Sequence, residues 1–168
     1  QKIRLDEVKL TAKELQDIQK IHIVACGTAY HAGLVGKYAI EKLVRIPVEV
    51  EVASEFRYRD PIINDKTLVM VISQSGETAD TLAALRLGKS AGARVAAITN
   101  VVGSSVSREA DDVIYTWAGP EIAVASTKAY TTQLLAVYMF ALYMAEIRNT
   151  ISDQERIDIY QALQLIPD

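Results

Sequence analysis

Apolar and polar residues follow two different periods along this chain. Five short apolar runs predict strands, at 21–26, 48–53, 67–72, 94–99 and 112–117. The run VEVEVA at 48–53 alternates valine with glutamate, which indicates a strand with one wet face. The run TLVMVI at 67–72 has no such alternation, as expected for a strand that is buried on both faces of a sheet.

Between these runs, the apolar positions have helical spacing. Helices are predicted at 30–45, 78–90, 127–147 and 153–165, with a short helical piece at 104–110. Thr11 and Glu14 have the spacing of a capping box, so a further helix should begin there and end near Lys20. The helix at 127–147 is apolar on nearly every side, so we expect it to be buried or to lie at an interface.

Strands that alternate with helices indicate a parallel sheet covered on both faces. We therefore predict a three-layer αβα fold, with a doubly wound, five-stranded parallel sheet of the flavodoxin-like kind and right-handed crossovers. Residues 1–168 should form a single domain. Its parts should be an N-terminal helical lead-in at 1–20, an α/β core at 20–150 and a C-terminal helical extension at 151–168.

Composition restricts the function classes. Half of the 168 residues are hydrophobic, so the chain can bury a core. Lys and Arg number 18 against 21 Asp and Glu, a net charge of −3, and the absence of a basic cluster argues against nucleic acid as a partner. The longest apolar run, 134–145, is too short to cross a membrane. No metal or organic cofactor is expected, because two histidines and one cysteine leave no zinc-site spacing.

Two details concern the origin of the chain. A single cysteine cannot form an internal disulfide, which fits a reducing, cytoplasmic location. The first residue is Gln rather than Met and the last is Asp after Pro, so we expect a fragment of a longer polypeptide.

Candidate chemistry gathers in the turns that follow two of the strands. If the strand order is 2-1-3-4-5, the order reverses between the first and third strands, and ligands bind at such a point. Those strands are followed by CGTA at 26–29 and SQSGET at 73–78. Each turn leads into a predicted helix, whose free N–H groups and dipole attract an anion, and the hydroxyls add donors. The two turns predict a phosphate site; the alternative is that Ser75 or Thr78 merely caps its helix.

Other motifs point to no competing chemistry. The dinucleotide fingerprint, the P-loop and the nucleophile elbow are all missing from the sequence. We expect Cys26 to line the core or a pocket, and the two histidines to be structural or exposed. The segment at 121–128 leaves the same edge of the sheet and is placed to close over the same ligand. Ser126 or Thr127 could also simply cap the long helix.

Three segments together resemble a known family: IVACGTAYHAG, SQSGETADT and EIAVASTKAYTTQ. They are similar to sugar isomerase (SIS) domains, and more narrowly to the first of two tandem SIS domains in the glutamine–fructose-6-phosphate aminotransferases, also called glucosamine-6-phosphate synthases. The resemblance covers residues 11–150, with Ala29 where the family often has Ser and Ala123 where it commonly has Gly. It implies that the sugar phosphate is held by Thr28, Ser73, Gln74, Ser75 and Thr78, and that the sugar is lined by Cys26, Gly27, Val124 and Ser126.

The resemblance also implies an activity for the parent chain. Enzymes of that family convert fructose 6-phosphate and glutamine to glucosamine 6-phosphate and glutamate, by transferring ammonia to the ketose and isomerising the product to an aldose. A glutaminase domain supplies the ammonia, and the second SIS domain supplies the lysine, glutamate and histidine of the acid–base machinery. This chain would therefore bind fructose 6-phosphate, or glucosamine or glucose 6-phosphate, but carry no catalytic residue and be inactive alone.

Partners and alternatives follow from the same resemblance. The expected partners are the second SIS domain and the glutaminase domain of the parent chain, and a second copy in a homodimer. One alternative is a non-catalytic phosphosugar-sensing SIS module. The other is a stand-alone phosphosugar isomerase, whose acid–base residue would be Glu55, Glu77 or Glu121.

Overall fold

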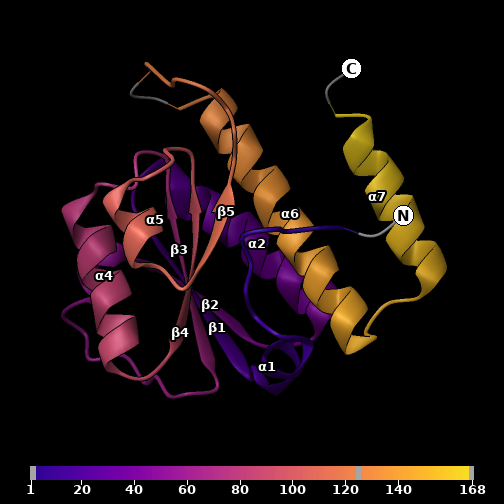
Figure 1. The fold of residues 1–168 in the computed structure, drawn as a ribbon, viewed down its shortest axis with the longest axis horizontal. Coiled ribbons are helices and arrows are strands. Elements are labelled where there is room, and N and C mark those ends of the chain that lie inside the picture. Colours follow the sequence, from indigo (N-terminus) through magenta and orange to yellow (C-terminus); the bar gives the residue numbers. More distant parts are fainter. Residues whose placement is uncertain (1–2, 124–125, 167–168) are drawn as a thin grey trace.

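The computed structural model describes residues 3–123 and 126–166. One parallel sheet lies at its centre, with the strand order β2-β1-β3-β4-β5 (Figure 1). Both the five predicted strands and the predicted order are confirmed, so the order reverses between β1 and β3. The strands are β1 (Lys20–Ala25), β2 (Val48–Val52), β3 (Thr67–Ser73), β4 (Arg94–Thr99) and β5 (Asp112–Tyr115).

Helices alternate with the strands, as the pattern predicts. The capping box at the start of α1 is confirmed, because Thr11 and Glu14 each bond to the other's backbone N–H. The four-residue helix α3 was not predicted, since a single turn is too short to show a helical period. The helices are α1 (Ala12–Asp17), α2 (Thr28–Val44), α3 (Ala53–Phe56), α4 (Ala79–Ser90), α5 (Ser105–Glu109), α6 (Lys128–Arg148) and α7 (Asp153–Gln164).

Helices cover both faces of the sheet, which makes three layers. Successive strand residues point to opposite faces, so Ile23 of β1 packs among residues of α1, α2 and α6, whereas Val24 packs among residues of α3, α4 and α5. Strand β3 is buried along its whole length. The two hydrophobic cores fix the ends of β1 and β3 firmly, and those ends carry the candidate turns.

Helices α2 and α6 cross in close contact. An ideal Cβ at Gly36 of α2 would lie 2.6 Å from Cγ1 of Val137 on α6, so only glycine allows this approach. Because α2 begins at the first candidate turn, the crossing also brings the amino-terminal part of α6 toward that turn. The start of α2 and the amino-terminal part of α6 therefore meet at the carboxyl ends of the strands.

The outer side of α6 is only partly covered. Helix α7 packs against it, has no fully buried residue, and leaves an apolar groove of about 320 Å³ between the two helices. The groove is lined by Leu134, Leu135 and Tyr138 from α6 and by apolar residues of α7. Within the described ranges, no helix combines the length and apolarity needed to span a membrane.

The glutamates of β2 form an ion-pair network at the sheet edge. Lys20 lies 2.7 Å from Glu49, and Arg59 bonds to Glu51 at 2.5 Å. Nδ1 of the buried His22 lies 3.0 Å from the same Glu51 carboxylate. His22 is thus buried in the sheet and paired with Glu51.

Candidate functional site

A cavity of about 190 Å³ opens at the carboxyl ends of β1 and β3, where the strand order reverses. It brings together both candidate turns, as the sequence predicts. Its walls carry hydroxyl, amide and thiol groups, and none of the described residues that line it has a charged side chain. The lining residues are Cys26, Thr28, Ala29, Ile72, Ser73, Gln74, Ser75, Thr78, Thr81 and Gln133.

The turn after β3 is held by its own side chains and by α5. The hydroxyl oxygen of the buried Ser73 accepts a hydrogen bond from the N–H of Gly76 at 3.0 Å, and that of Ser75 accepts one from the N–H of Glu77 at 3.3 Å. The carbonyl of Gly76 accepts from the N–H of Val106 on α5 at 3.0 Å. Each of the two serines still has a hydroxyl proton to donate, so the turn is fixed without using up its donors.

Both helices that begin at the cavity lack a side-chain cap. Thr78 is the N-cap residue of α4 and Gly27 is that of α2, and no side chain of the described structure caps either helix. Thr78 therefore occupies the N-cap position of α4 without making the side-chain hydrogen bond of a capping residue. Free N–H groups and the positive ends of two helix dipoles face one small polar cavity, an arrangement that suits an anion.

Two nearby carboxylates are engaged elsewhere. Glu77 accepts a hydrogen bond from the N–H of Ser105 at 2.8 Å, and this bond lowers the pKa of its carboxyl group. Glu121 accepts from the N–H groups of Thr127 and Ala129, both at 3.2 Å, and the bond from Ala129 contributes most to lowering its pKa. Both groups stay ionised near neutral pH, which does not suit a general acid.

The residues expected around the sugar lie partly beyond this cavity. Gly27 has a φ of +59°, and no atom of the residues that the structure describes lies within 4 Å of its Cβ position. Ser126 does not line the cavity, and its buried Oγ has no hydrogen-bond partner among the described residues. Val124 lies outside the described residues. The structure thus assembles the phosphate end of the predicted site more completely than the sugar end.

Two polar lining residues, Thr81 and Gln133, were not predicted from the sequence. Thr81 lies one helical turn after Thr78 on α4, and this spacing could have indicated it. Gln133 lies on α6, is only 2% exposed, and its Oε1 has no hydrogen-bond partner in the described structure. The available signal was a polar residue directly before the apolar run at 134–145.

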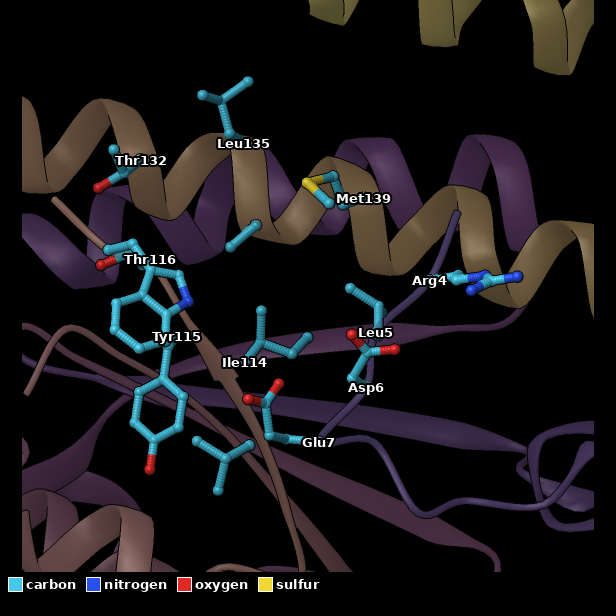
Figure 2. A pocket seen from close by; sticks show the side chains of 13 residues that line it. Arg4, Leu5, Asp6, Glu7, Ile114, Tyr115, Thr116, Thr132, Leu135 and Met139 are labelled. Atoms are coloured by element: carbon cyan, nitrogen blue, oxygen red, sulfur yellow. The ribbon is translucent and has the colours of Figure 1, made fainter. Parts of the chain in front are cut away.

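A larger cavity of about 510 Å³ lies along β5 rather than at the strand ends. Figure 2 shows Arg4, Asp6 and Glu7 toward one end of it and Tyr115 and Thr116 toward the other. Its lining mixes opposite charges and apolar side chains, which does not single out an anion. The small cavity between the two turns is therefore the better candidate for the predicted phosphate.

Comparison with known proteins identifies the family. The model of the SIS domain matches residues 14–143. The chain belongs to the SIS domain family. The fold and the two hydroxyl-bearing turns described above are thus those of a SIS domain.

Relatives of this SIS domain are much longer proteins. The chain is 65% identical to a glutamine–fructose-6-phosphate aminotransferase (isomerizing) of Clostridium tetani and 64% identical to one of Clostridium perfringens, over 99% of its own length. It spans about 27% of the length of each. The C-terminal domain of the glucosamine-fructose-6-phosphate aminotransferase of Francisella tularensis superposes with a TM-score of 0.88 at 47% identity, covering 91% of this chain and 44% of that one.

Proposed function

We propose that this SIS domain binds the phosphate group of a phosphosugar in the cavity between the turns at 26–29 and 73–78. The observation that carries the proposal is the convergence of Thr28, Ser75 and Thr78 on a cavity faced by two uncapped helix N-termini. A phosphate dianion offers only acceptors, whereas this cavity offers mainly donors. Helix N-termini and hydroxyls bind it without the aid of a lysine or arginine.

The size of the cavity fits the phosphate rather than the whole ligand. Pockets that enclose a drug-sized molecule have about 300–1,000 Å³, and this one has about 190 Å³. The sugar would then extend over Gly27, where the Cβ position is open, toward Cys26 and the segment at 121–126. Val124 and Ser126 are proposed to line it there.

The proposed place of this domain is the first SIS domain of a glutamine–fructose-6-phosphate aminotransferase. Support comes from the relatives that carry this name and match nearly the whole chain. The longer protein would convert fructose 6-phosphate and glutamine to glucosamine 6-phosphate and glutamate in the cytoplasm. This chain would anchor fructose 6-phosphate, or glucosamine or glucose 6-phosphate, while a glutaminase domain and a second SIS domain supply ammonia and the acid–base groups. In this proposal 1–168 is a single SIS domain with its α/β core at 20–150, and no metal or organic cofactor takes part.

The test is a titration of fructose 6-phosphate and inorganic phosphate against single variants. Thr78→Ala removes a hydroxyl that makes no hydrogen bond in the described structure, so the fold should be unaffected. Ser75→Ala removes a second donor. A hydrogen bond to a charged group contributes about 1.5–3 kcal/mol, so each variant should bind both ligands roughly tenfold or more weakly.

Ser90→Ala provides a matched control for the titration. Ser90 ends the same helix, and its hydroxyl donates to the carbonyl of Leu87, far from the cavity. Its affinity for both ligands should equal that of the wild type. Unchanged affinity in Ser75→Ala and Thr78→Ala would overturn the assignment of this cavity.

A homodimer is part of the same proposal. The apolar groove between α6 and α7, together with Ile166 and Leu165, leaves apolar surface that a second copy would cover. Sedimentation equilibrium at micromolar concentrations should give a mass of two chains. A single-chain mass throughout that range would remove the dimer from the proposal.

A further inference from the structure

Gln133 is a buried polar residue without an evident structural role. The residue is 2% exposed, and within the described residues its Oε1 accepts no hydrogen bond. Leaving a buried polar atom unpaired costs free energy, so such groups usually have a partner or a function. Gln133 lines the cavity at the ends of β1 and β3 together with several other polar groups.

Packing holds Gln133 in this position. On α6 its helical neighbours Ala129, Ala136 and Val137 are all buried, so they lie on the same inward face. Val137 is in close contact with Gly36 of α2, which fixes the depth at which α6 lies. The amide is therefore held on the inward face of α6, at the wall of the cavity.

Groups of complementary character surround the amide. Thr28 comes from the turn after β1, Ser73 from the end of β3, and Thr81 from α4; all three line the same cavity as Gln133. Hydroxyl donors thus reach the cavity from β3, α2 and α4, and the amide NH₂ of Gln133 adds two N–H donors from α6. Rotation of the amide by 180° exchanges the positions of Nε2 and Oε1. A bound anion would favour the orientation in which Nε2 faces it.

We infer that Gln133 is a ligand-binding residue that donates a hydrogen bond from Nε2 to the phosphate of the bound phosphosugar. This inference rests on the proposed function, since it assigns a further donor to the same site. Nε2 bonds to a phosphate oxygen, and Oε1 turns toward a threonine hydroxyl of the wall. The long helix α6 is thereby tied to the ligand at a point that neither turn reaches.

The first variant replaces the amide by a side chain of similar length. Gln133→Met removes both polar atoms, and because Oε1 is unpaired, the melting temperature of the ligand-free protein should not fall. Affinity for inorganic phosphate and for fructose 6-phosphate should both fall about tenfold, as expected for one hydrogen bond to a charged group. A purely structural role predicts the reverse: a lower melting temperature and unchanged affinities.

The second variant and the control sharpen the test. Gln133→Glu places a carboxylate beside the phosphate, so affinity should fall further than in Gln133→Met and should fall more steeply as the pH rises. Gln154→Met is the matched control, because Gln154 is an exposed residue of α7 that bonds to Asp158 and does not line the cavity. It should bind both ligands as the wild type does.

The wild-type protein provides a measurement that does not depend on the folding of any variant. The side-chain amide resonances of Gln133 should shift on titration with inorganic phosphate, and unshifted resonances at saturation would overturn the inference. If wild type binds neither ligand, the proposed function itself fails. If Ser75→Ala and Thr78→Ala weaken binding while Gln133→Met and Gln133→Glu do not, only the role of Gln133 is refuted.

Discussion

Gly76 should be the least replaceable residue of the turn after β3. Its φ is +66°, and an ideal Cβ there would lie 2.2 Å from Oγ of Ser104 and 2.6 Å from its Cβ. Ser104 is 2% exposed and caps α5, so it cannot move aside easily. Gly92, after α4, has a φ of +86° but nothing within 4 Å of its Cβ position. Both glycines have a positive φ, but only at Gly76 would a Cβ atom collide with a neighbouring side chain.

The expected costs follow from this difference. A non-glycine residue in left-handed conformation costs roughly 1–2 kcal/mol, so Gly92→Ala should lower the free energy of unfolding by about that amount. Overpacking adds about 1–3 kcal/mol, so Gly76→Ala should cost about 2–5 kcal/mol in all. In a domain of this size, each kcal/mol lost from the free energy of unfolding lowers the melting temperature by about 2–4 °C. The melting temperature of Gly76→Ala should therefore fall by roughly 4–20 °C.

Urea unfolding of both variants measures these costs directly. The double variant Gly76→Ala/Ser104→Gly removes the two closest contacts and leaves Oγ1 of Thr99 at 2.9 Å, so it should recover part of the overpacking cost, since glycine at an N-cap costs only about a few tenths of a kcal/mol. Gly76→Ala should also weaken phosphate binding, because it displaces the turn, whereas Gly92→Ala should not. Equal costs at the two glycines, or no recovery in the double variant, would refute the steric argument.

Two further predictions concern titratable groups. Hydrogen bonds from backbone N–H groups, that of Ala129 first, lower the pKa of Glu121, so its stabilising effect should be lost as the pH falls through that lowered pKa. Glu121→Gln should loosen the segment at 121–129 and weaken fructose 6-phosphate binding more than inorganic phosphate binding, and equal effects on both ligands would contradict this. Burial lowers the pKa of His22 despite its bond to Glu51, so the unfolded state takes up a proton first and stability should fall as the pH drops below about 6.5. The melting temperature of His22→Gln should depend less on pH between 8 and 5.5, and an unchanged slope would argue against this role.

Most of the fold could be predicted from hydrophobic pattern alone. The buried run at 67–72 and the alternating run at 48–53 became β3 and β2, because burial on two faces or one leaves a clear trace in sequence. The last strand is shorter than predicted: β5 ends at Tyr115, and Trp117 has a φ of +52°, which a strand cannot continue through. A positive φ at a tryptophan leaves no recognisable pattern in the sequence, so the early end of β5 could not be predicted.

The site could be predicted in part, for a related reason. The turns at 26–29 and 73–78 meet because strand order places them together, and that order follows from general rules of parallel sheets. Gln133 reaches the cavity only because α6 crosses α2 closely at Gly36, a packing detail that depends on side chains far apart in the chain. Likewise, whether the Thr78 side chain caps α4 depends on its conformation, and the spacing of residues in the sequence does not reveal that conformation.

In the proposed function, the cavity between the two turns holds the phosphate of the ligand. A crystal structure of the protein with fructose 6-phosphate tests it most directly, because the phosphorus position is easily located. We expect phosphorus inside the cavity of about 190 Å³, with phosphate oxygens within hydrogen-bond distance of Ser75, Thr78 and the first N–H groups of α4. A phosphate bound elsewhere, such as in the cavity along β5, with this cavity empty, would contradict it.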